Sequence, residues 1–203
     1  MKQYQSSEIR NFAIVGHGAS GKTSFSEAML KLGGEINRLG TIEDGSTTSD
    51  YHPGEKDRKI SIHATPLHME WTDKKFNMID TPGYSDFVGE SFGSLNVVDL
   101  AVITIHACNG VEVGTETMWN QATKLGIPKM LVINGFDRDN TRFDEILDQA
   151  KRRFGNNVFP MQIPVNPGSG YNQNVDVLRT ELITYKLDQS GSMNESELPN
   201  DLK

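Results

Sequence analysis

The sequence predicts an α/β domain with a mostly parallel sheet and helices on both faces of that sheet. Short apolar runs of strand length alternate with stretches of helical periodicity along most of the chain. The first apolar run leads through a glycine-rich loop directly into a helix. Residues 60–79 instead contain two strand patterns in succession, which predicts one antiparallel hairpin at an edge of the sheet. Regular alternation of strands and helices is typical of parallel sheets, because each crossover between parallel strands needs a connecting helix.

The spacing of the apolar residues predicts the first strand and the first helix. Phe12 to Val15 is a short apolar run and predicts a buried strand. Lys22 to Leu32 carries apolar residues at helical spacing and ends at a glycine pair, which predicts a helix. Glu35 to Lys59 is polar, aperiodic and glycine-containing. A loop of that length inside a compact domain is usually either functional or disordered.

The remaining elements follow in regular order. Alternation predicts two strands after the long loop, Ile60 to Trp71 with a bulge or edge position at Thr65-Pro66, and Phe76 to Ile79. Then come a helix at Phe87 to Val97, a strand at Leu100 to Ile105, a helix at Glu116 to Leu125, a strand at Lys129 to Ile133, a helix at Phe143 to Phe154 and a strand at Val158 to Val165. The polar tail, Gln189 to Lys203, is expected to be loop-like.

Composition excludes several classes of function. The net charge of −7 argues against a domain that grips nucleic acid through its own basic surface, so we expect no sequence-specific DNA binding. The chain has neither a signal-peptide core nor an apolar run of about 20 residues, so we expect no membrane partner. One cysteine, Cys108, cannot form an internal disulfide. That usage predicts a cytoplasmic protein, and we interpret Cys108 as a packing residue.

The loop after the first strand fits the phosphate-loop pattern GxxxxGK[ST], with a strand before it and a helix after it. Glycines let backbone N–H groups curl around phosphate oxygens, and the helix presents its positive dipole end. Lys22 supplies a charge to the phosphates, and the hydroxyl of Thr23 ligates Mg²⁺. This motif alone allows ATPases, kinases and GTPases. The predicted nucleotide-binding residues here are Gly16, His17, Gly18, Ala19, Ser20, Gly21, Lys22, Thr23 and Ser24.

A second phosphate element, Asp80-Thr81-Pro82-Gly83, follows an apolar strand about sixty residues later. It has the DxxG arrangement. Asp80 is predicted to hold Mg²⁺ through water, and the N–H of Gly83 to contact the γ-phosphate and sense its loss. Thr81 and Pro82 are predicted to belong to the same nucleotide site.

Asn134-Gly135-Phe136-Asp137 follows another predicted strand and resembles NKxD, the guanine-reading motif. In that motif the aspartate accepts hydrogen bonds from N1–H and the 2-amino group of guanine, a pattern that adenine cannot donate. Asp137 fits this role, and Asn134 would brace the loop. Gly135 replaces the lysine whose aliphatic stem normally lies along the base, so we expect weaker nucleotide binding. An Asn-Gly turn is the simpler alternative for this segment.

Taken together, the motifs GHxxxGKT, GxxxxD at Gly45 to Asp50, RxIxI, DTPGYxDF and IxxxDR match in order over about residues 8 to 180. In this respect the chain resembles the G domain of bacterial elongation factor G. The resemblance implies a P-loop G domain that uses GTP/GDP with Mg²⁺ and acts on the ribosome in translocation. Within Arg58-Lys59-Ile60-Ser61-Ile62, the family's metal-coordinating threonine falls on Ser61, which keeps the hydroxyl.

The resemblance also suggests a domain organisation. Val158 to Gly168 is similar to the start of the inserted G′ subdomain of that family. We therefore predict a G domain over 1–157 that lacks its last strand and fifth guanine motif, the start of a G′ insertion over 158–188, and the polar tail over 189–203. The chain is interpreted as an N-terminal fragment that is monomeric, with the ribosome contacted through the full-length protein.

Four residues depart from the family's pattern at its catalytic end. Tyr84 stands where the family has the histidine that positions the attacking water, so it is the candidate catalytic residue. Gly18 replaces one wing of a hydrophobic gate opposite Ile60, and Ala19 replaces an aspartate near the phosphates. Gly135 is the fourth departure. Loss of a water-orienting group typically costs ~10²–10⁴-fold in rate. The hypothesis is a divergent paralogue with weak or absent hydrolysis.

Three functions remain as alternatives at this point. The first is a GTP-hydrolysing domain of a translocase, or of a release or rescue factor that shares these motifs. The second is a nucleotide-gated ribosome ligand without useful catalysis. The third is an ATP-using P-loop enzyme, against which Asp137 argues.

Overall fold

The computed structural model describes residues 2–188 and 190–202. Met1 and Lys203, the ends of the predicted domains, and Gln189, the start of the predicted tail, lie outside the described residues. The chain divides into two compact units, each treated by itself below. The first comprises Met1–Ile105 and Glu112–Val132, and the second His106–Val111 and Ile133–Lys203.

The elements occur in the following order along the chain: η1 Ser6–Glu8, β1 Ile9–Gly16, α1 Lys22–Leu32, α2 Pro53–Arg58, β2 Thr65–Trp71, β3 Lys74–Asp80, η2 Ser85–Phe87, α3 Val88–Leu95, β4 Leu100–His106, α4 Val113–Lys124, β5 Lys129–Asn134, α5 Phe143–Phe154, β6 Gln162–Pro164, β7 Gln173–Asp176, β8 Glu181–Tyr185, β9 Met193–Glu197 and η3 Asn200–Leu202.

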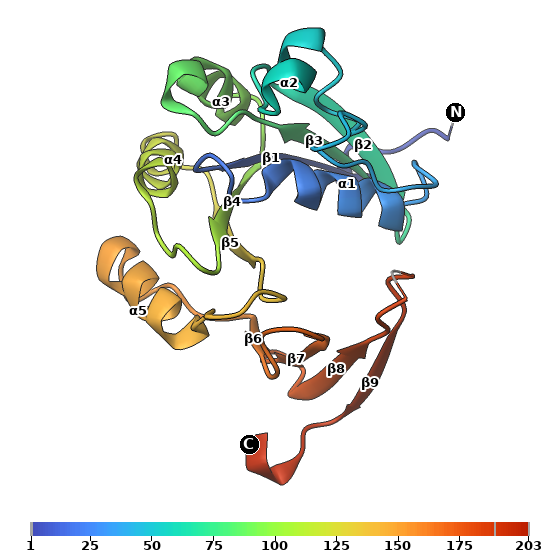
Figure 1. Ribbon diagram of the computed structural model, residues 1–203, viewed down its shortest axis with the longest axis vertical. Helices are drawn as coiled ribbons and strands as arrows, with labels where there is room; N and C mark the ends of the chain where they lie inside the picture. Colours follow the sequence, from blue (N-terminus) through green and yellow to red (C-terminus); the bar gives the residue numbers. More distant parts are fainter. Residues whose placement is uncertain (1, 189, 203) are drawn as a thin grey trace. The chain divides into compact units, whose positions relative to one another are not determined.

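The main sheet confirms the predicted α/β fold with its mostly parallel sheet. Its strand order is β2-β3-β1-β4-β5. Strand β1 pairs in parallel with β3 and with β4, whereas β2 pairs antiparallel with β3 as the predicted edge hairpin. Figure 1 shows α1 on one side of this sheet and α3 and α4 on the other.

Alternation of side chains along β1 produces two separate cores. Phe12 and Ile14 pack with Leu30 of α1 on one face of the sheet. Ala13 and Val15 pack on the opposite face with Leu95 of α3 and with Met118 and Ala122 of α4. A strand that is apolar at every position is expected where both faces are covered. The apolar run at Phe12 to Val15 therefore forms a central strand of the sheet, and it is buried as predicted.

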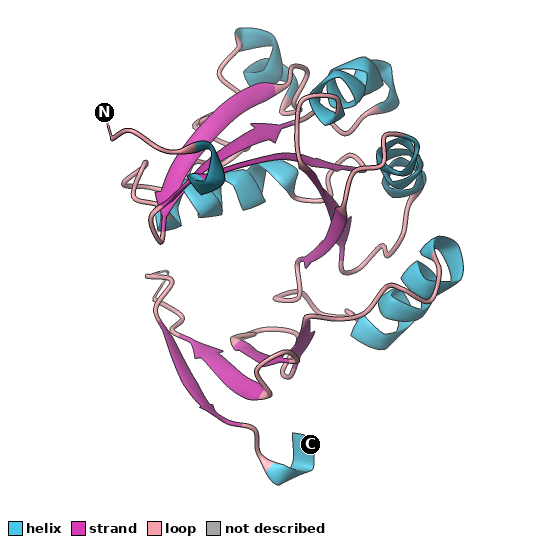
Figure 2. Cartoon of the chain, turned by 180° about the vertical axis from the view of Figure 1, so that it is seen from behind, coloured by secondary structure: helices cyan, strands magenta, loops and turns pink. Residues whose placement is uncertain are grey.

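The second unit contains a separate antiparallel sheet with strand order β6-β7-β8-β9. Each strand pairs antiparallel with the next along the chain. Figure 2 shows these strands as a meander that includes the segment near the C-terminus. Helix α5 belongs to the same unit. No helix among residues 2–188 and 190–202 combines the length and apolar character of a membrane-spanning segment.

Three expectations about the elements are wrong. The predicted strand Ile60 to Trp71 begins only at Thr65, because carboxylates accept the backbone N–H groups of Ile62, His63 and Ala64. The long polar loop contains α2, a helix of six residues that is too short to show a period. The predicted strand Val158 to Val165 is reduced to β6.

The polar tail also differs from its expectation. Within it, Met193–Glu197 forms strand β9, which pairs with Glu181–Tyr185 rather than remaining a loop. All five residues of β9 are exposed, so its sequence carries no alternation of apolar and polar side chains. Strand pairing there depends on the backbone, which a hydrophobic pattern does not report.

Candidate functional site

The predicted phosphate loop joins β1 to α1 through a tightly packed turn. Gly21 precedes α1 in the left-handed region, with φ 90° and ψ 23°. At Gly16 a Cβ would lie 2.6 Å from the carbonyl oxygen of Thr104 on β4. Ser20 Oγ donates to His17 O at 2.8 Å and lies 2.6 Å from Thr104 Oγ1. The loop is thus shaped by glycines and by a hydroxyl of the neighbouring strand, and it leads into the N-terminus of α1, where anions bind favourably.

Lys22 is buried in this loop, with 6% of its surface exposed. Its ammonium group donates to the carbonyl oxygens of His17 at 2.7 Å and of Gly16 at 3.5 Å. Burial lowers the pKa of Lys22 to about 8, although nearby Asp80 and Asp50 favour the charged form. A buried cation held by carbonyl groups is well placed to interact with phosphate oxygens.

Two buried carboxylates lie near this cation. Asp80 ends β3 with 1% of its surface exposed, and Asp50 in the loop before α2 has 4% exposed. Ser49 Oγ donates to Asp80 Oδ2 at 2.7 Å. Among the described residues, neither Asp80 Oδ1 nor Asp50 Oδ2 has a hydrogen-bond partner. Burial raises the pKa of Asp80 to about 6 and raises that of Asp50. Carboxylate oxygens that are buried without partners are costly unless a cation satisfies them.

The hydroxyl groups of Thr23 and Ser61 meet at the same place. Thr23 Oγ1 on α1 lies 3.2 Å from Ser61 Oγ, although 38 residues separate them in the sequence. The predicted metal residues Thr23, Ser61 and Asp80 are therefore brought together in the first unit. Oxygen ligands of this kind suit Mg²⁺, which is bound by one or two carboxylates together with phosphates and water. The residues present fit that ion.

The DxxG segment lies directly against the phosphate loop. A Cβ at Gly83 would overlap Lys22 Nζ and would lie 2.7 Å from His17 O and 2.8 Å from Gly18 N. Only a glycine fits so close to another backbone. Thr81 Oγ1 donates to Ile14 O at 2.8 Å, and Ser91 Oγ of α3 donates to Pro82 O at 2.9 Å. Thr81 and Pro82 thus anchor the segment between β1 and α3.

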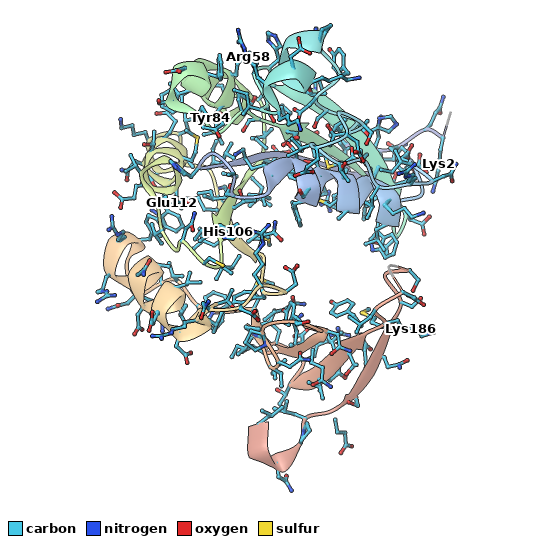
Figure 3. The ribbon with its side chains drawn as sticks, viewed as in Figure 1. Lys2, Arg58, Tyr84, His106, Glu112 and Lys186 are labelled. Atoms are coloured by element: carbon cyan, nitrogen blue, oxygen red, sulfur yellow. The ribbon has the colours of Figure 1, made fainter. Side chains whose placement is uncertain are left out.

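Tyr84 lies over Gly18. A Cβ at Gly18 would meet Cε1 and Cζ of the Tyr84 ring at 3.2 Å and Cδ1 at 3.4 Å. Tyr84, labelled in Figure 3, is an exposed residue, with 46% of its surface accessible. Positions 18 and 84, at which the sequence predicts departures from the family's pattern, are therefore in contact. The aromatic ring at position 84 uses the space that a side chain at position 18 would need.

His17 connects the phosphate loop to the start of α4. The N–H of Gly114 donates to His17 Nδ1 at 3.3 Å, and His17 Nε2 lies 3.6 Å from Glu112 Oε1. A Cβ at Gly114 would lie 2.7 Å from His17 Cα. These contacts agree with the interpretation of His17 as a residue that packs the loop rather than one that reacts.

The predicted base-reading residues belong to the second unit. Gly135 has φ 91°, a conformation that favours glycine, and a Cβ there would lie 3.3 Å from Nε2 of His106. His106, labelled in Figure 3, is held by the N–H of Cys108, which donates to its Nδ1 at 3.2 Å. A lysine at position 135 would therefore be strained in this backbone, and the His106 ring would have to give way by a few tenths of an ångström.

The other residues of this loop divide between packing and exposure. The side chain of Phe136 is buried, with ring centroids 6.1 Å from Phe143 and 5.8 Å from Tyr171. Its carbonyl oxygen accepts from Gly168 N at 2.7 Å. Asp137 is exposed and Asn134 is half-buried. The loop is thus anchored by Phe136, which leaves the Asp137 carboxylate accessible.

Two predicted residues of the phosphate loop are exposed. Ala19 has φ 59°, in the left-handed region, and Ser24 lies on the outer surface of α1. Sequence reasoning missed the roles of Ser49 and Asp50, which the fold places beside Asp80. The available signal was the match of Gly45 to Asp50 with the pattern GxxxxD. It also missed His106, for which no local pattern carries a signal.

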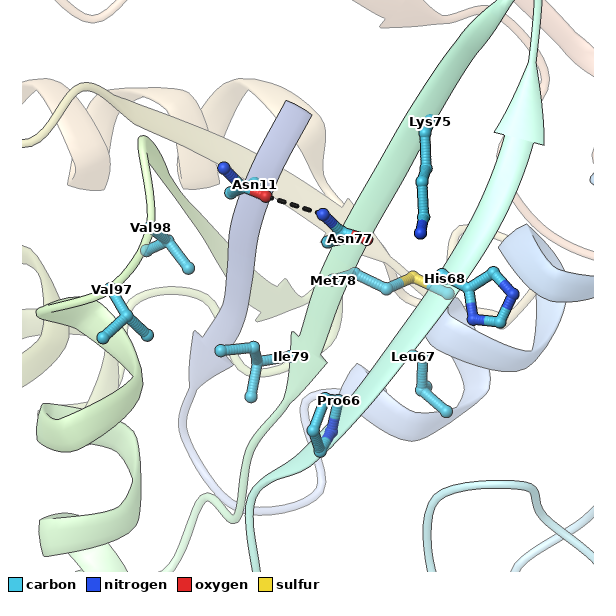
Figure 4. Close-up of a pocket in the computed structure, with 10 residues that line it drawn as sticks. All are labelled: Asn11, Pro66, Leu67, His68, Lys75, Asn77, Met78, Ile79, Val97 and Val98. Carbon is cyan, nitrogen blue, oxygen red and sulfur yellow. Dashed lines mark hydrogen bonds between the residues drawn. The ribbon is translucent and has the colours of Figure 1, made fainter. Parts of the chain in front are cut away.

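A pocket of about 280 Å³ lies elsewhere in the first unit. Figure 4 shows it on the sheet formed by β1, β2 and β3, next to Val97 and Val98. Asn77 Nδ2 donates to Asn11 Oδ1 at 2.9 Å within it. None of the predicted site residues lines this pocket, so it is separate from the candidate site.

Comparisons with known proteins agree with the motifs. The family model described as the elongation factor Tu GTP binding domain matches residues 7–188. Among solved structures, the chain is similar to the crystal structure of a protein from Thermus thermophilus, with a TM-score of 0.88 and 33% sequence identity. That similarity covers 97% of this chain and 29% of the other, so the present chain spans less than a third of that protein's chain.

Proposed function

Since the chain belongs to the elongation factor Tu GTP-binding domain family, we propose that it is the guanine-nucleotide-binding part of a divergent elongation factor G-like protein. In this proposal the full-length protein acts on the ribosome in the cytoplasm during translocation. The chain would comprise a G domain over 1–157, the start of a G′ insertion over 158–188 and the polar tail. The observation that carries the proposal is the buried cluster of Lys22, Thr23, Ser61 and Asp80 beside a glycine-shaped loop.

Each residue of the cluster has a role in binding. Backbone N–H groups of the phosphate loop and the charge of Lys22 would hold the phosphates. Thr23 and Ser61 would ligate Mg²⁺, and Asp80 would hold it through water, with Asp50 beside it. When bound, Mg²⁺ neutralises charge on the phosphate oxygens. Asp137 would accept hydrogen bonds from guanine, which adenine cannot supply.

Weakened hydrolysis is part of the proposal. Tyr84 stands at the family's water-positioning position, and its ring lies against Gly18. A phenol is larger than an imidazole and does not become a cation. With the ring in that position, Tyr84 is a poor replacement for a group that must orient a water molecule and exchange a proton with it.

Binding is tested by calorimetric titration of the chain with GDP and with ADP in Mg²⁺. Micromolar affinity for GDP with none for ADP is the expected result. Saturable binding of ADP at a comparable affinity would contradict the proposal and favour an ATP-using enzyme.

The second candidate function is a nucleotide-gated ribosome ligand without useful catalysis. The contact between Tyr84 and Gly18 favours it. Hydrolysis of GTP by the full-length protein on ribosomes separates the two. A rate ~10²-fold or more below that of a family member with histidine at this position supports the second candidate, and an equal rate eliminates it.

A further inference from the structure

Glu55 is a buried carboxylate outside the predicted site. It lies on α2 with 1% of its surface exposed, whereas its neighbours Lys56 and Asp57 are exposed. Nothing in the motif analysis assigns it a role. A carboxylate at this depth is costly to bury unless hydrogen bonds satisfy it, so its partners indicate what it does.

Three backbone N–H groups donate to this carboxylate. Glu55 Oε1 accepts from Ile62 at 2.9 Å and from His63 at 3.0 Å. Its other oxygen, Oε2, accepts from His52 at 3.2 Å. One side chain therefore joins the residue before α2 to the segment after it. Hydrogen bonds to an ionised acceptor are stronger than neutral ones.

The segment held in this way carries Ser61. Ile62 directly follows Ser61, and the Ser61 hydroxyl lies 3.2 Å from Thr23 Oγ1. Residues 60–64 belong to no helix or strand. Before Ser61, the N–H of Ile60 donates to the carbonyl oxygen of Glu55 at 3.3 Å, and after Ser61 the Glu55 side chain accepts two hydrogen bonds, so Glu55 holds the backbone on both sides of Ser61.

We propose that Glu55 is a positioning residue for Ser61, so that binding of the triphosphate form depends on a carboxylate that touches neither metal nor nucleotide. This inference rests on the proposed function, because it requires Ser61 to ligate Mg²⁺ in the triphosphate state. Contacts of this segment with Mg²⁺ and the γ-phosphate distinguish that state from the diphosphate state. Loss of Glu55 should therefore weaken binding of a GTP analogue but not of GDP.

The test compares four proteins: wild type, Glu55→Gln, Ser61→Ala and the double variant. In Glu55→Gln the new amide N–H₂ faces backbone donors, which removes at least one of the three hydrogen bonds at almost unchanged volume. The dissociation constants of a non-hydrolysable GTP analogue and of GDP are measured in Mg²⁺. Asp57→Asn, an exposed acid on the same helix, is the matched control.

The expected result is about a 10-fold weaker affinity of Glu55→Gln for the GTP analogue, the size seen for residues that orient metal ligands. GDP affinity should change less than twofold, and Asp57→Asn should change neither. Ser61→Ala should show a similar selective loss, and the double variant no further loss. Without nucleotide, amide exchange at Ile62 and His63, measured by NMR, should accelerate in Glu55→Gln only.

Other outcomes overturn the inference. Equal weakening of GDP and analogue would make Glu55 a general fold residue, and full additivity with Ser61→Ala would show that it does not act through Ser61. If wild type binds neither GDP nor the GTP analogue, both the proposed function and this inference are overturned. If wild type binds both nucleotides and Glu55→Gln binds them with the same affinities, only the inference is overturned. If Glu55→Gln does not fold, Glu55→Asp, which shortens the reach of the carboxylate, replaces it under the same criteria.

Discussion

At the scale of single residues, two positions where the sequence predicts a departure from the family's pattern are in contact. A Cβ placed at Gly18 would lie 3.2 Å from the Tyr84 ring. Gly135 has φ 91°, and a Cβ there would lie 3.3 Å from His106, so a lysine at this position would be strained in the present backbone. These departures are therefore linked to local structure. Restoring one family residue at a time should conflict with what now surrounds it.

The pair at positions 18 and 84 gives a prediction about stability. Gly18→Val should lower the free energy of unfolding by about 1 kcal/mol, because its Cβ would lie 3.2 Å from the Tyr84 ring and the ring would have to shift. Adding Tyr84→His should recover most of that loss, with a coupling free energy above about 0.5 kcal/mol. Denaturant unfolding of wild type and of the single and double variants measures this coupling free energy. Gly89→Val is the control, because a Cβ there meets no atom within 4 Å. Additive losses would show that the two positions are independent.

At the scale of elements, carboxylates take the place of strand pairing in the segment between α2 and β2. Ile62 and His63 donate to Glu55, and Ala64 donates to Glu90 of α3. A similar arrangement holds the first part of the long loop, where Glu27 of α1, 2% exposed, accepts from Gly40 at 2.8 Å and from Thr48 at 2.5 Å. This loop is thus held by acidic residues of the helices rather than by strand pairing.

Helix α2 ends at a strained residue. Lys59, the C-terminal capping residue of α2, has φ 57° and ψ 38°. A left-handed conformation costs a non-glycine residue about 1 kcal/mol, so Lys59→Gly should raise the free energy of unfolding by about that amount. Thermal unfolding measures the change. Asp57→Gly within the same helix should instead lower it by about 0.5–1 kcal/mol. A loss of stability in Lys59→Gly would show that the lysine side chain makes a compensating contact.

At the scale of the whole molecule, the phosphate site is built at the expense of stability. Asp50, Asp80 and Lys22 are all buried, and burial disfavours the charged form of each. A folded domain without a cation therefore holds Asp80 in an unfavourable state at neutral pH. Binding of Mg²⁺ with nucleotide would relieve that cost, and functional sites commonly carry such a penalty.

This cost has a definite pH dependence. Asp80 has a pKa of about 6 when folded, against an ordinary value of 3.8. Well below pH 3.8 it is protonated in both states, and as pH rises through 3.8 towards 6 the unfolded state releases the proton first, so stability falls. Without Mg²⁺ and nucleotide, the free energy of unfolding of Asp80→Asn should rise relative to that of wild type across that range, by on the order of 2–3 kcal/mol. Denaturant unfolding of both proteins at pH 4.5 and at pH 7 measures the difference in their free energies of unfolding. The same difference at both pH values would contradict the destabilising effect of the buried Asp80 charge.

The sequence anticipated the features that depend on local pattern. Helix α1, the two-faced strand β1 and the edge hairpin follow from the spacing of apolar residues. Helix α2 was not predicted because six residues contain less than two turns, and β9 was not because all its side chains are exposed. The motifs predicted that Lys22, Thr23 and Asp80 lie together, whereas Ser49 and His106 make contacts between distant segments that no local spacing reports.

The most direct test of the guanine site is an exchange of base specificity at Asp137. Asp137→Asn should lose affinity for GDP, because the new amide donor faces the 2-amino group of guanine, and should gain affinity for XDP, whose 2-oxo group accepts that donor. Titration of wild type and variant with GDP, XDP and ADP measures it. Exchange from GDP to XDP is the predicted result. Unchanged binding of GDP by Asp137→Asn would contradict the assignment of Asn134 to Asp137 as the base-reading loop.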